Sequence, residues 1–447
     1  MKRSTEPLAT PPAEAQINPS AINQPAASRG ELWFGKYRWV ICALLLFGIT
    51  KNYMDRQVLG ILKTTLQHDL GWSEIQYAHL VLFFQGAYAL GMLVVGRLVD
   101  RIGTKLGYAL AMGFWSVAAI AHAGCVSFVS FALARSTLGF WEAGVFPASI
   151  KAVADWFPRK ERALATGIFN AGTSLGATVT PLVTPWITAR WGWRWAFASI
   201  GAVGAVWLFW WLAFYRKPEE DPRISQEELA YIRADQPQSS TPIPWRRLLP
   251  HRQTWAFVTG KFMLDPIWWF YLFWVPDFLQ RRHGLPLTQI GVPIVMIYLL
   301  SDVGSIGGGW LSSTLIHRGY GVNLGRKMAM LASALCVVPI VLAYHAQSLP
   351  LAVVLIGMAA AGHQGFSANL FTMTTDLFPT QAVGSVVGIG GMAGAIGGML
   401  IAEIVGYILQ TTGSYQIPFF VAGSSYLVAL AVIQILTPRL EPANLER

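Results

Sequence analysis

The chain has 447 residues, of which 54% are hydrophobic and only 13% are charged. Soluble proteins carry roughly 25% charged residues, so this composition excludes an ordinary soluble protein. The formal net charge of +10 raises the alternative of a nucleic-acid-binding protein, which the positions of the charges must decide.

Residues 1–30 are rich in Pro, Ala and Ser and contain no apolar core. This composition is typical of a disordered tail and not of a cleavable signal peptide. The three cysteines, Cys42, Cys125 and Cys336, are scattered through apolar segments, so we expect neither a disulfide framework nor a metal site. No residue pattern indicates a cofactor.

Apolar segments recur along the rest of the chain, each of about 20 residues, long enough to cross a bilayer. We therefore predict an all-α polytopic membrane protein with twelve transmembrane helices in two pseudo-symmetric six-helix halves. The expected spans are 39–66, 77–99, 106–125, 127–153, 163–187, 194–215, 254–280, 289–313, 326–345, 349–375, 383–410 and 415–437.

One long connection divides the predicted spans into two sets of six. Residues 216–253 are charged and rich in Pro, and one short amphipathic helix is expected near 225–235. We predict an N-terminal bundle at 31–215, a central loop at 216–253, a C-terminal bundle at 254–437 and a tail at 438–447.

Lysine and arginine are distributed unevenly over the predicted connections. Most lie in the two tails, the central loop and the turns after the second, fourth and eighth spans. The opposite side holds only Arg190, Arg194, Arg281 and Arg282. By the positive-inside rule, both termini and the central loop are predicted to be cytoplasmic. The positive charge therefore reflects membrane topology, and we expect no nucleic-acid partner.

The two halves repeat each other. The sequence DWFP at 155–158 recurs as DLFP at 376–379, and three glycines recur at the same offset: Gly167 with Gly388, Gly176 with Gly397, and Gly192 with Gly413. Duplicated six-helix halves are typical of transporters, whose binding site lies near the midplane between the halves.

The segment GRLVDRIGTK at 96–105 resembles the signature loop of the major facilitator superfamily, although Thr104 departs from its pattern. The resemblance implies the twelve-helix fold of that superfamily. Asp100 ends a predicted helix beside Arg101, within a cluster of cytoplasmic charges. We predict that these two residues gate the transporter by locking one conformation. A plain positively charged turn is the alternative interpretation.

Charged residues lie deep inside two predicted spans. In KNYMDRQ, at 51–57, Asn52, Asp55 and Arg56 share a helix face by their spacing, and Lys51 is placed to pair with Asp55. Ionisable groups at such depth are costly and indicate function by default.

The fourth span holds a second charged pair, Arg135 and Glu142, two helical turns apart. Arginine keeps its proton and matches a carboxylate, whereas a desolvated Asp or Glu can titrate. The two pairs therefore predict a proton-coupled site for an anion. Purely structural ion pairing is the alternative.

Three longer segments, NYMDR, ARSTLGFWEAGVFPA and ADWFPRKERALATGIFNAGTSLGA, resemble the anion:cation symporter branch of the superfamily. The resemblance implies that Asp55 and Glu142 carry protons, that Arg56 binds a substrate carboxylate and that Arg135 partners Glu142. It also implies that Tyr53 and Tyr88 supply hydroxyl groups. Thr173 stands where the galactonate carriers of this branch have glutamine, which disfavours galactonate.

The segments LDPIWWFYLFWVPDFLQ and GHQGFSANLFTMTTDLFP resemble hexuronate permeases. Aromatic side chains such as Trp268 can stack on a sugar, although most tryptophans fit an interfacial belt equally well. His363, Gln364, Asn369 and Asn170 suit sugar hydroxyls or, alternatively, hydrogen bonds between helices.

Together these features predict a monomeric inner-membrane transporter that imports a sugar-acid anion, galacturonate or glucuronate, with protons. Another small carboxylate, such as an aldonate, tartrate or an aromatic acid, is the second choice. The sequence lacks GxxxxGK[ST] and HExxH, which disfavours an enzyme. A non-transporting membrane sensor is disfavoured because such a protein needs an added signalling domain.

Overall fold

The computed structural model describes residues 37–233 and 245–445, so the tail predicted at 1–30 lies outside the described residues. Within these two ranges every regular element is a helix. The backbone N–H and C=O groups of a helix pair with each other within the helix, and a chain that crosses hydrocarbon requires such internal pairing.

The N-terminal half consists of six spans. They are α1 with α2 (Arg38–Ile61 and Lys63–Leu70), α3 (Glu74–Ile102), α4 with η2 (Thr104–Ala121 and His122–Gly124), α5 with α6 (Phe128–Glu142 and Val145–Trp156), α7 with α8 (Arg159–Asn170 and Gly172–Trp191) and α9 (Trp193–Phe214).

The connection to the second half contains η3 (Pro218–Glu220), α10 (Gln226–Arg233) and α11 (Trp245–Leu248). The C-terminal half then adds α12 (Arg252–His283), η4 (Leu287–Gln289) with α13 (Gly291–His317), α14 with η5 (Gly321–Val337 and Val338–His345), α15 (Leu349–Leu377), α16 (Thr380–Thr412) and α17 (Gln416–Leu436). The short helix expected near 225–235 corresponds to α10.

Eight helices of the described chain are long and apolar enough to cross a membrane by themselves. The other four spans are α1–α2, α5–α6, α7–α8 and α12. Charged residues lower the hydropathy of α1 and α12, whereas α5–α6 and α7–α8 are interrupted at Gly144 and just before Gly172. Both glycines lie where a neighbouring helix comes too close for a side chain, Gly144 beside Val95 and Gly172 beside Thr50.

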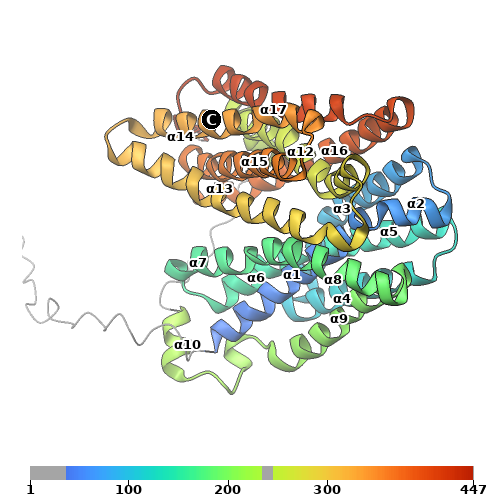
Figure 1. The fold of residues 1–447 in the computed structure, drawn as a ribbon. Helices are drawn as coiled ribbons and strands as arrows, with labels where there is room; N and C mark the ends of the chain where they lie inside the picture. Colours follow the sequence, from blue (N-terminus) through green and yellow to red (C-terminus); the bar gives the residue numbers. More distant parts are fainter. Residues whose placement is uncertain (1–36, 234–244, 446–447) are drawn as a thin grey trace, which may run out of the picture.

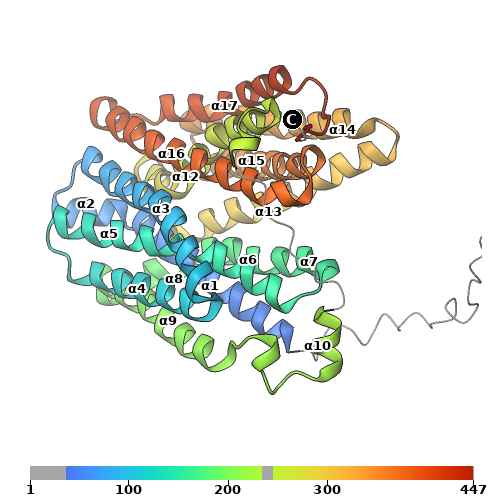
Figure 2. The ribbon, with the colours of Figure 1, turned by 180° about the vertical axis from the view of Figure 1, so that it is seen from behind.

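The two halves form separate bundles that meet along one seam (Figures 1 and 2). Figure 1 shows them close together where α2 and α3 lie beside α12 and α16, and far apart at the end that carries α10 and α14. We call these the closed end and the open end. One hydrophobic core fills the N-terminal half, and a second spans the C-terminal half and the closed end.

Glycines bring the halves together at the closed end. A side chain at Gly60 of α1 would meet the backbone of Leu272 and Phe273 in α12. A side chain at Gly406 of α16 would meet Ala78 of α3 in the same way. Small residues at such positions let helix backbones approach closely, which places the groups between them within reach of both halves.

Candidate substrate and proton site between the halves

The centre of the candidate site is an ion pair between α1 and α5. Arg56 Nε donates to Glu142 Oε2 at 2.7 Å, and both side chains are buried. Arg56 Nη2 and Glu142 Oε1 have no hydrogen-bond partner among the described residues. The pair therefore keeps one free donor and one free acceptor in a place from which water is excluded.

Four aromatic rings surround the guanidinium group of Arg56. Its Cζ atom lies 4.6 Å from the ring centroid of Tyr88, 5.4 Å from that of Tyr53 and 5.6 Å from that of Phe84. The fourth ring, Trp269 at 5.4 Å, belongs to α12 of the opposite half. Cations are attracted to such ring faces, so the rings fix Arg56 at the layer between the halves.

Asp55 points elsewhere. Its carboxylate pairs with Lys51 Nζ at 2.5 Å, as its spacing predicts, and accepts a hydrogen bond from Trp115 Nε1 at 2.9 Å. Lys51 also donates to Ser116 Oγ at 3.2 Å, so this pair lies inside the N-terminal half against α4. Asp55 and Arg56 therefore contact different helices, because adjacent helix positions are about 100° apart.

Arg135 is buried beside the Phe84 ring, with 4.5 Å between its Cζ atom and the ring centroid. Its three side-chain nitrogens have no hydrogen-bond partner among the described residues. The resemblance implies that Arg135 partners Glu142, but in this structure the carboxylate pairs with Arg56. In this structure α1 therefore supplies the partner of Glu142.

The opposite half presents aromatic groups to this layer. Trp268 stacks on His363, with ring centroids 4.9 Å apart, and meets Tyr298 edge-on at 5.9 Å. His363 Nδ1 lies 2.7 Å from the hydroxyl of Tyr426, which fixes the orientation of the imidazole.

The other predicted polar residues fall into different surroundings. Asn52 is buried, and neither atom of its amide has a hydrogen-bond partner in the described part of the chain. Asn369 donates to the carbonyls of Gly308 and Gly365 and so links α15 to α13, as the alternative interpretation expects. Gln364 is half-buried, and Asn170 is exposed at the end of α7, where its carbonyl accepts from Thr173 Oγ1 at 2.9 Å.

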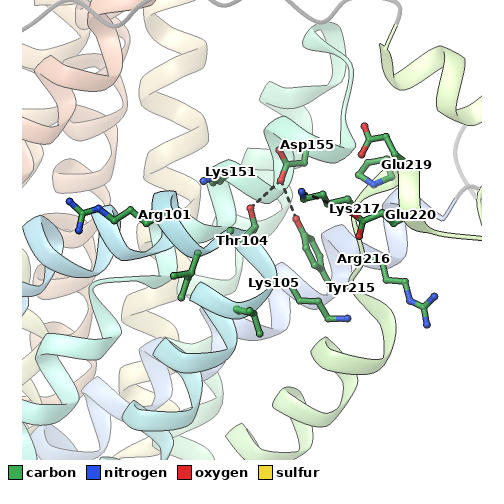
Figure 3. Close-up of a pocket in the computed structure, with 14 residues that line it drawn as sticks. Arg101, Thr104, Lys105, Lys151, Asp155, Tyr215, Arg216, Lys217, Glu219 and Glu220 are labelled. Atoms are coloured by element: carbon green, nitrogen blue, oxygen red, sulfur yellow. Dashed lines mark hydrogen bonds and ion pairs between the residues drawn. The ribbon is translucent and has the colours of Figure 1, made fainter.

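The predicted gate lies at the open end. The side chain of Asp100 is outside the described part of the structure, and Arg101 is exposed. Arg101 lines a cavity of about 890 Å³, but its side chain points away from the group that organises this cavity (Figure 3). That group is Asp155, which accepts from Thr104 Oγ1 at 3.1 Å and from the Tyr215 hydroxyl at 3.2 Å.

Sequence reasoning missed a ring of four charges that seals the closed end. Lys63 pairs with Glu74 at 2.7 Å and with Asp277 at 2.8 Å, and Arg281 pairs with the same two carboxylates at 2.5 and 2.9 Å. Each ion therefore has two oppositely charged neighbours. Lys63 and Glu74 belong to one half and Asp277 and Arg281 to the other, so the four-charge ring joins the halves.

Further hydrogen bonds support the four-charge ring. Asp277 also accepts from Thr64 Oγ1 at 3.1 Å and from the hydroxyl of Tyr415. The signal in the sequence that could have identified this ring is a base and an acid near the ends of apolar spans, at Lys63 and Asp277. Charges of opposite sign at the same membrane depth are candidates for such a pair.

Among the described residues, nearly all polar contacts between the halves lie on the closed-end side of Arg56. An exception at mid-span is Ser174 Oγ, which donates to Asp302 Oδ1 at 2.6 Å and joins α8 to α13. The described polar contacts between the halves are therefore concentrated on one side of the site. Among the same residues, no cluster of His, Cys, Asp or Glu is arranged to hold a metal ion.

A polytopic bundle of two six-helix halves with charged groups buried at their seam defines a membrane transporter and not an enzyme. The sequence matches the Major Facilitator Superfamily over residues 45–402, and the chain belongs to that family.

Curated relatives of the chain are named as sugar-acid transporters. The hexuronate transporter of Escherichia coli K12 is 32% identical over 417 residues, which cover 91% of this chain and 96% of the relative. The galacturonate transporter of Dickeya chrysanthemi is 32% identical over 67% of this chain and 89% of its own length. The D-galactonate transporter of Escherichia coli O6:H1 is 28% identical over 90% and 95% of the two chains.

Solved structures support the fold. A D-xylose–proton symporter gives a TM-score of 0.70 at 14% identity, covering 91% of this chain and 99% of that chain. A bacterial homologue of the lysosomal transporter Spinster, in an inward-facing and unoccupied conformation, gives a TM-score of 0.66 at 18% identity over 90% and 96% of the chains.

Proposed function

We propose that the chain imports a sugar-acid anion together with protons, by alternating access at the layer between its halves. The observation that carries this proposal is the buried Arg56–Glu142 pair, with its free Nη2 donor and free Oε1 acceptor. A permanently charged arginine facing the opposite half is a carboxylate anchor, and a water-free glutamate beside it is a group whose charge can change.

The coupling follows from competition for one guanidinium group. While Glu142 is ionised it occupies Arg56. A proton on Glu142 removes that charge and leaves Arg56 free to bind a substrate carboxylate with a planar fork of N–H groups. Arg135 is a second cation that Glu142 can approach, because it lies two helical turns away on α5 and has three unpaired nitrogens. Asp55 is proposed as a second proton carrier that acts through Lys51.

A hexuronate is the proposed substrate. The names of the relatives favour sugar acids, and the rings of Trp268, Tyr298 and His363 offer apolar faces to a pyranose. Asn52, Gln364, Asn369, Asn170 and Thr173 remain proposals as hydroxyl ligands. Galactonate and the galactarate or glucarate named for other relatives are the competing substrates, and the test below separates them.

The four-charge ring is proposed as the contact that breaks when the halves rock. With both termini cytoplasmic, as the Lys and Arg distribution predicts, the ring faces the opposite compartment and this structure is open toward the cytoplasm. Asp100 and Arg101 are then proposed to form the matching contact when the open end closes. We further propose that the chain lies in the inner membrane and acts as a monomer.

The test is uptake of labelled galacturonate by purified protein in liposomes, with and without an inward proton gradient. We expect accumulation that requires the gradient and is blocked by unlabelled glucuronate. Gradient-driven uptake of galactonate or glucarate in place of galacturonate would keep the mechanism and replace the substrate. Uptake of no acid by properly inserted protein would contradict the proposal.

A further inference from the structure

Gln85 of α3 is a buried amide with no hydrogen-bond partner. Its side chain is completely shielded from solvent, and both Oε1 and Nε2 lack a partner among the described residues. An unsatisfied buried amide destabilises the folded protein, and a leucine of similar size would avoid that loss. A buried polar group that destabilises the folded protein indicates a binding partner that is present only part of the time.

The position of Gln85 identifies the place where that partner binds. Gly86, the next residue, faces Met399 of α16, and a side chain at Gly398 of α16 would contact Gln85 Nε2 at 3.4 Å. The same point lies 2.8 Å from Trp269 Cδ1 and 3.2 Å from Trp269 Nε1. Gln85 and Trp269 therefore border one spot, where a side chain at position 398 could not fit without displacing Trp269.

This spot adjoins the guanidinium group of Arg56. Trp269 is one of the four rings around Arg56, and Phe84 and Tyr88, the neighbours of Gln85 in sequence and on the next helical turn, are two others. The free amide thus lies beside the proposed carboxylate anchor. An amide offers both donors and an acceptor, which are the groups that a sugar hydroxyl requires.

We propose that Gln85 hydrogen bonds a hydroxyl group of the substrate and so selects hydroxylated acids over plain carboxylates. This inference rests on the proposed function, since it needs Arg56 to hold the carboxylate. A site built to pair with a hydroxyl rejects an analogue that lacks it, because the buried polar group is then left unpaired.

The experiment compares binding of galacturonate and of cyclohexanecarboxylate, a ring acid without hydroxyls, by isothermal titration calorimetry on purified protein. We expect Gln85→Leu to weaken galacturonate binding by about tenfold and to leave cyclohexanecarboxylate binding unchanged. Gly398→Ala, which fills the spot without removing the amide, is expected to weaken galacturonate binding as well.

Gln410→Leu is the matched control. Gln410 lies on the same α3–α16 seam nearer the closed end, where its side-chain carbonyl accepts from the backbone N–H of Glu74 at 3.1 Å. We expect this variant to keep the wild-type ratio of the two affinities. Thermal unfolding provides a second readout: Gln85→Leu should be at least as stable as wild type without ligand, yet show a smaller stabilisation by galacturonate.

The outcomes separate this inference from the proposed function. Equal loss of both ligands, or no loss of either, in Gln85→Leu would overturn the role of Gln85 while leaving sugar-acid transport in place. Wild-type protein that binds none of the sugar acids would overturn both.

Discussion

The two halves share a repeated scaffold but bury different chemistry at their seam. The N-terminal half contributes the charges, with Arg56 and Glu142 at the seam and Lys51, Asp55 and Arg135 around them. The C-terminal half contributes rings, and among its described residues Lys261 and Asp265, 2.7 Å apart, pair with each other on α12. In the proposed function the N-terminal half therefore binds the carboxylate, and the C-terminal half contacts the sugar ring.

The repeated aspartates show what the two halves have kept in common. Asp155 ties the end of α6 to the start of α4 through neutral donors. Asp376 ties the end of α15 to the start of α14, but its donor is Arg326 Nε at 3.0 Å. The equivalent corner of each half is therefore held by hydrogen bonds to an aspartate. The donors are hydroxyl groups in the N-terminal half and a guanidinium group in the C-terminal half. The two aspartates thus keep the same structural role with different hydrogen-bond donors. The residues at the seam, in contrast, differ between the halves in charge and chemistry.

The largest effect is expected when the N-terminal half loses the planar guanidinium group of Arg56. We expect Arg56→Lys to weaken sugar-acid binding by about 100-fold, since an ammonium group cannot reproduce two parallel hydrogen bonds to a carboxylate. Equilibrium binding to purified protein measures the effect. Arg326→Lys, a change at an arginine outside the seam, should bind normally, and near-normal binding by Arg56→Lys would remove Arg56 as the anchor.

Glu142→Gln tests whether the carboxylate of Glu142 carries the coupled proton. The amide keeps an acceptor for Arg56 but carries no proton that can leave, so we expect accumulation against a gradient to disappear while exchange of internal for external substrate continues. Both rates are measured in the same liposomes. Accumulation at the wild-type level would exclude Glu142 from the proton path.

Asp277→Asn tests the seam away from the site. Loss of one charge leaves Lys63 and Arg281 facing each other with a single acid, and we expect the closed end to open more often, by about tenfold in population. Spin labels at His68 and Thr411, on opposite halves in a cysteine-free background, would report a longer distance. An unchanged distance distribution would show that the four-charge ring does not hold the halves together.

The smallest effect is expected at the repeated aspartates. Asp376→Asn leaves the Arg326 guanidinium without its acid. At Asp155→Asn, by contrast, the described hydrogen-bond donors are the hydroxyl groups of Thr104 and Tyr215. Because Arg326 and Asp376 are partly exposed, we expect the difference in unfolding free energy to be only about 1 kcal/mol. Thermal unfolding of the two variants measures it. A more stable Asp376→Asn than Asp155→Asn would contradict the comparison.

Local spacing and hydropathy were sufficient for much of the structure. Hydrophobic runs predict the helices, and a separation of four residues predicts the pairs Lys51–Asp55 and Lys261–Asp265, because such residues are neighbours on one helix. The repeat and the signature loop predict the fold, which the family match confirms.

Contacts between helices were not predictable in the same way. Arg56 and Glu142 are 86 residues apart and Lys63 and Asp277 are 214 apart, so no periodicity relates them. The choice of Arg56 over Arg135 as the partner of Glu142 depends on how α1 packs against α5. The same holds for Asn369, whose polar character fits a ligand and whose contacts fit a link between helices.

The central claim is that binding of a sugar acid to Arg56 is coupled to a proton on Glu142. Calorimetric titration of galacturonate in buffers of different ionisation enthalpy tests this most directly, because any proton taken up with the ligand comes from the buffer. We predict a binding enthalpy that varies with the buffer in the wild-type protein and does not vary in Glu142→Gln. The same enthalpy in every buffer for the wild type would contradict the account.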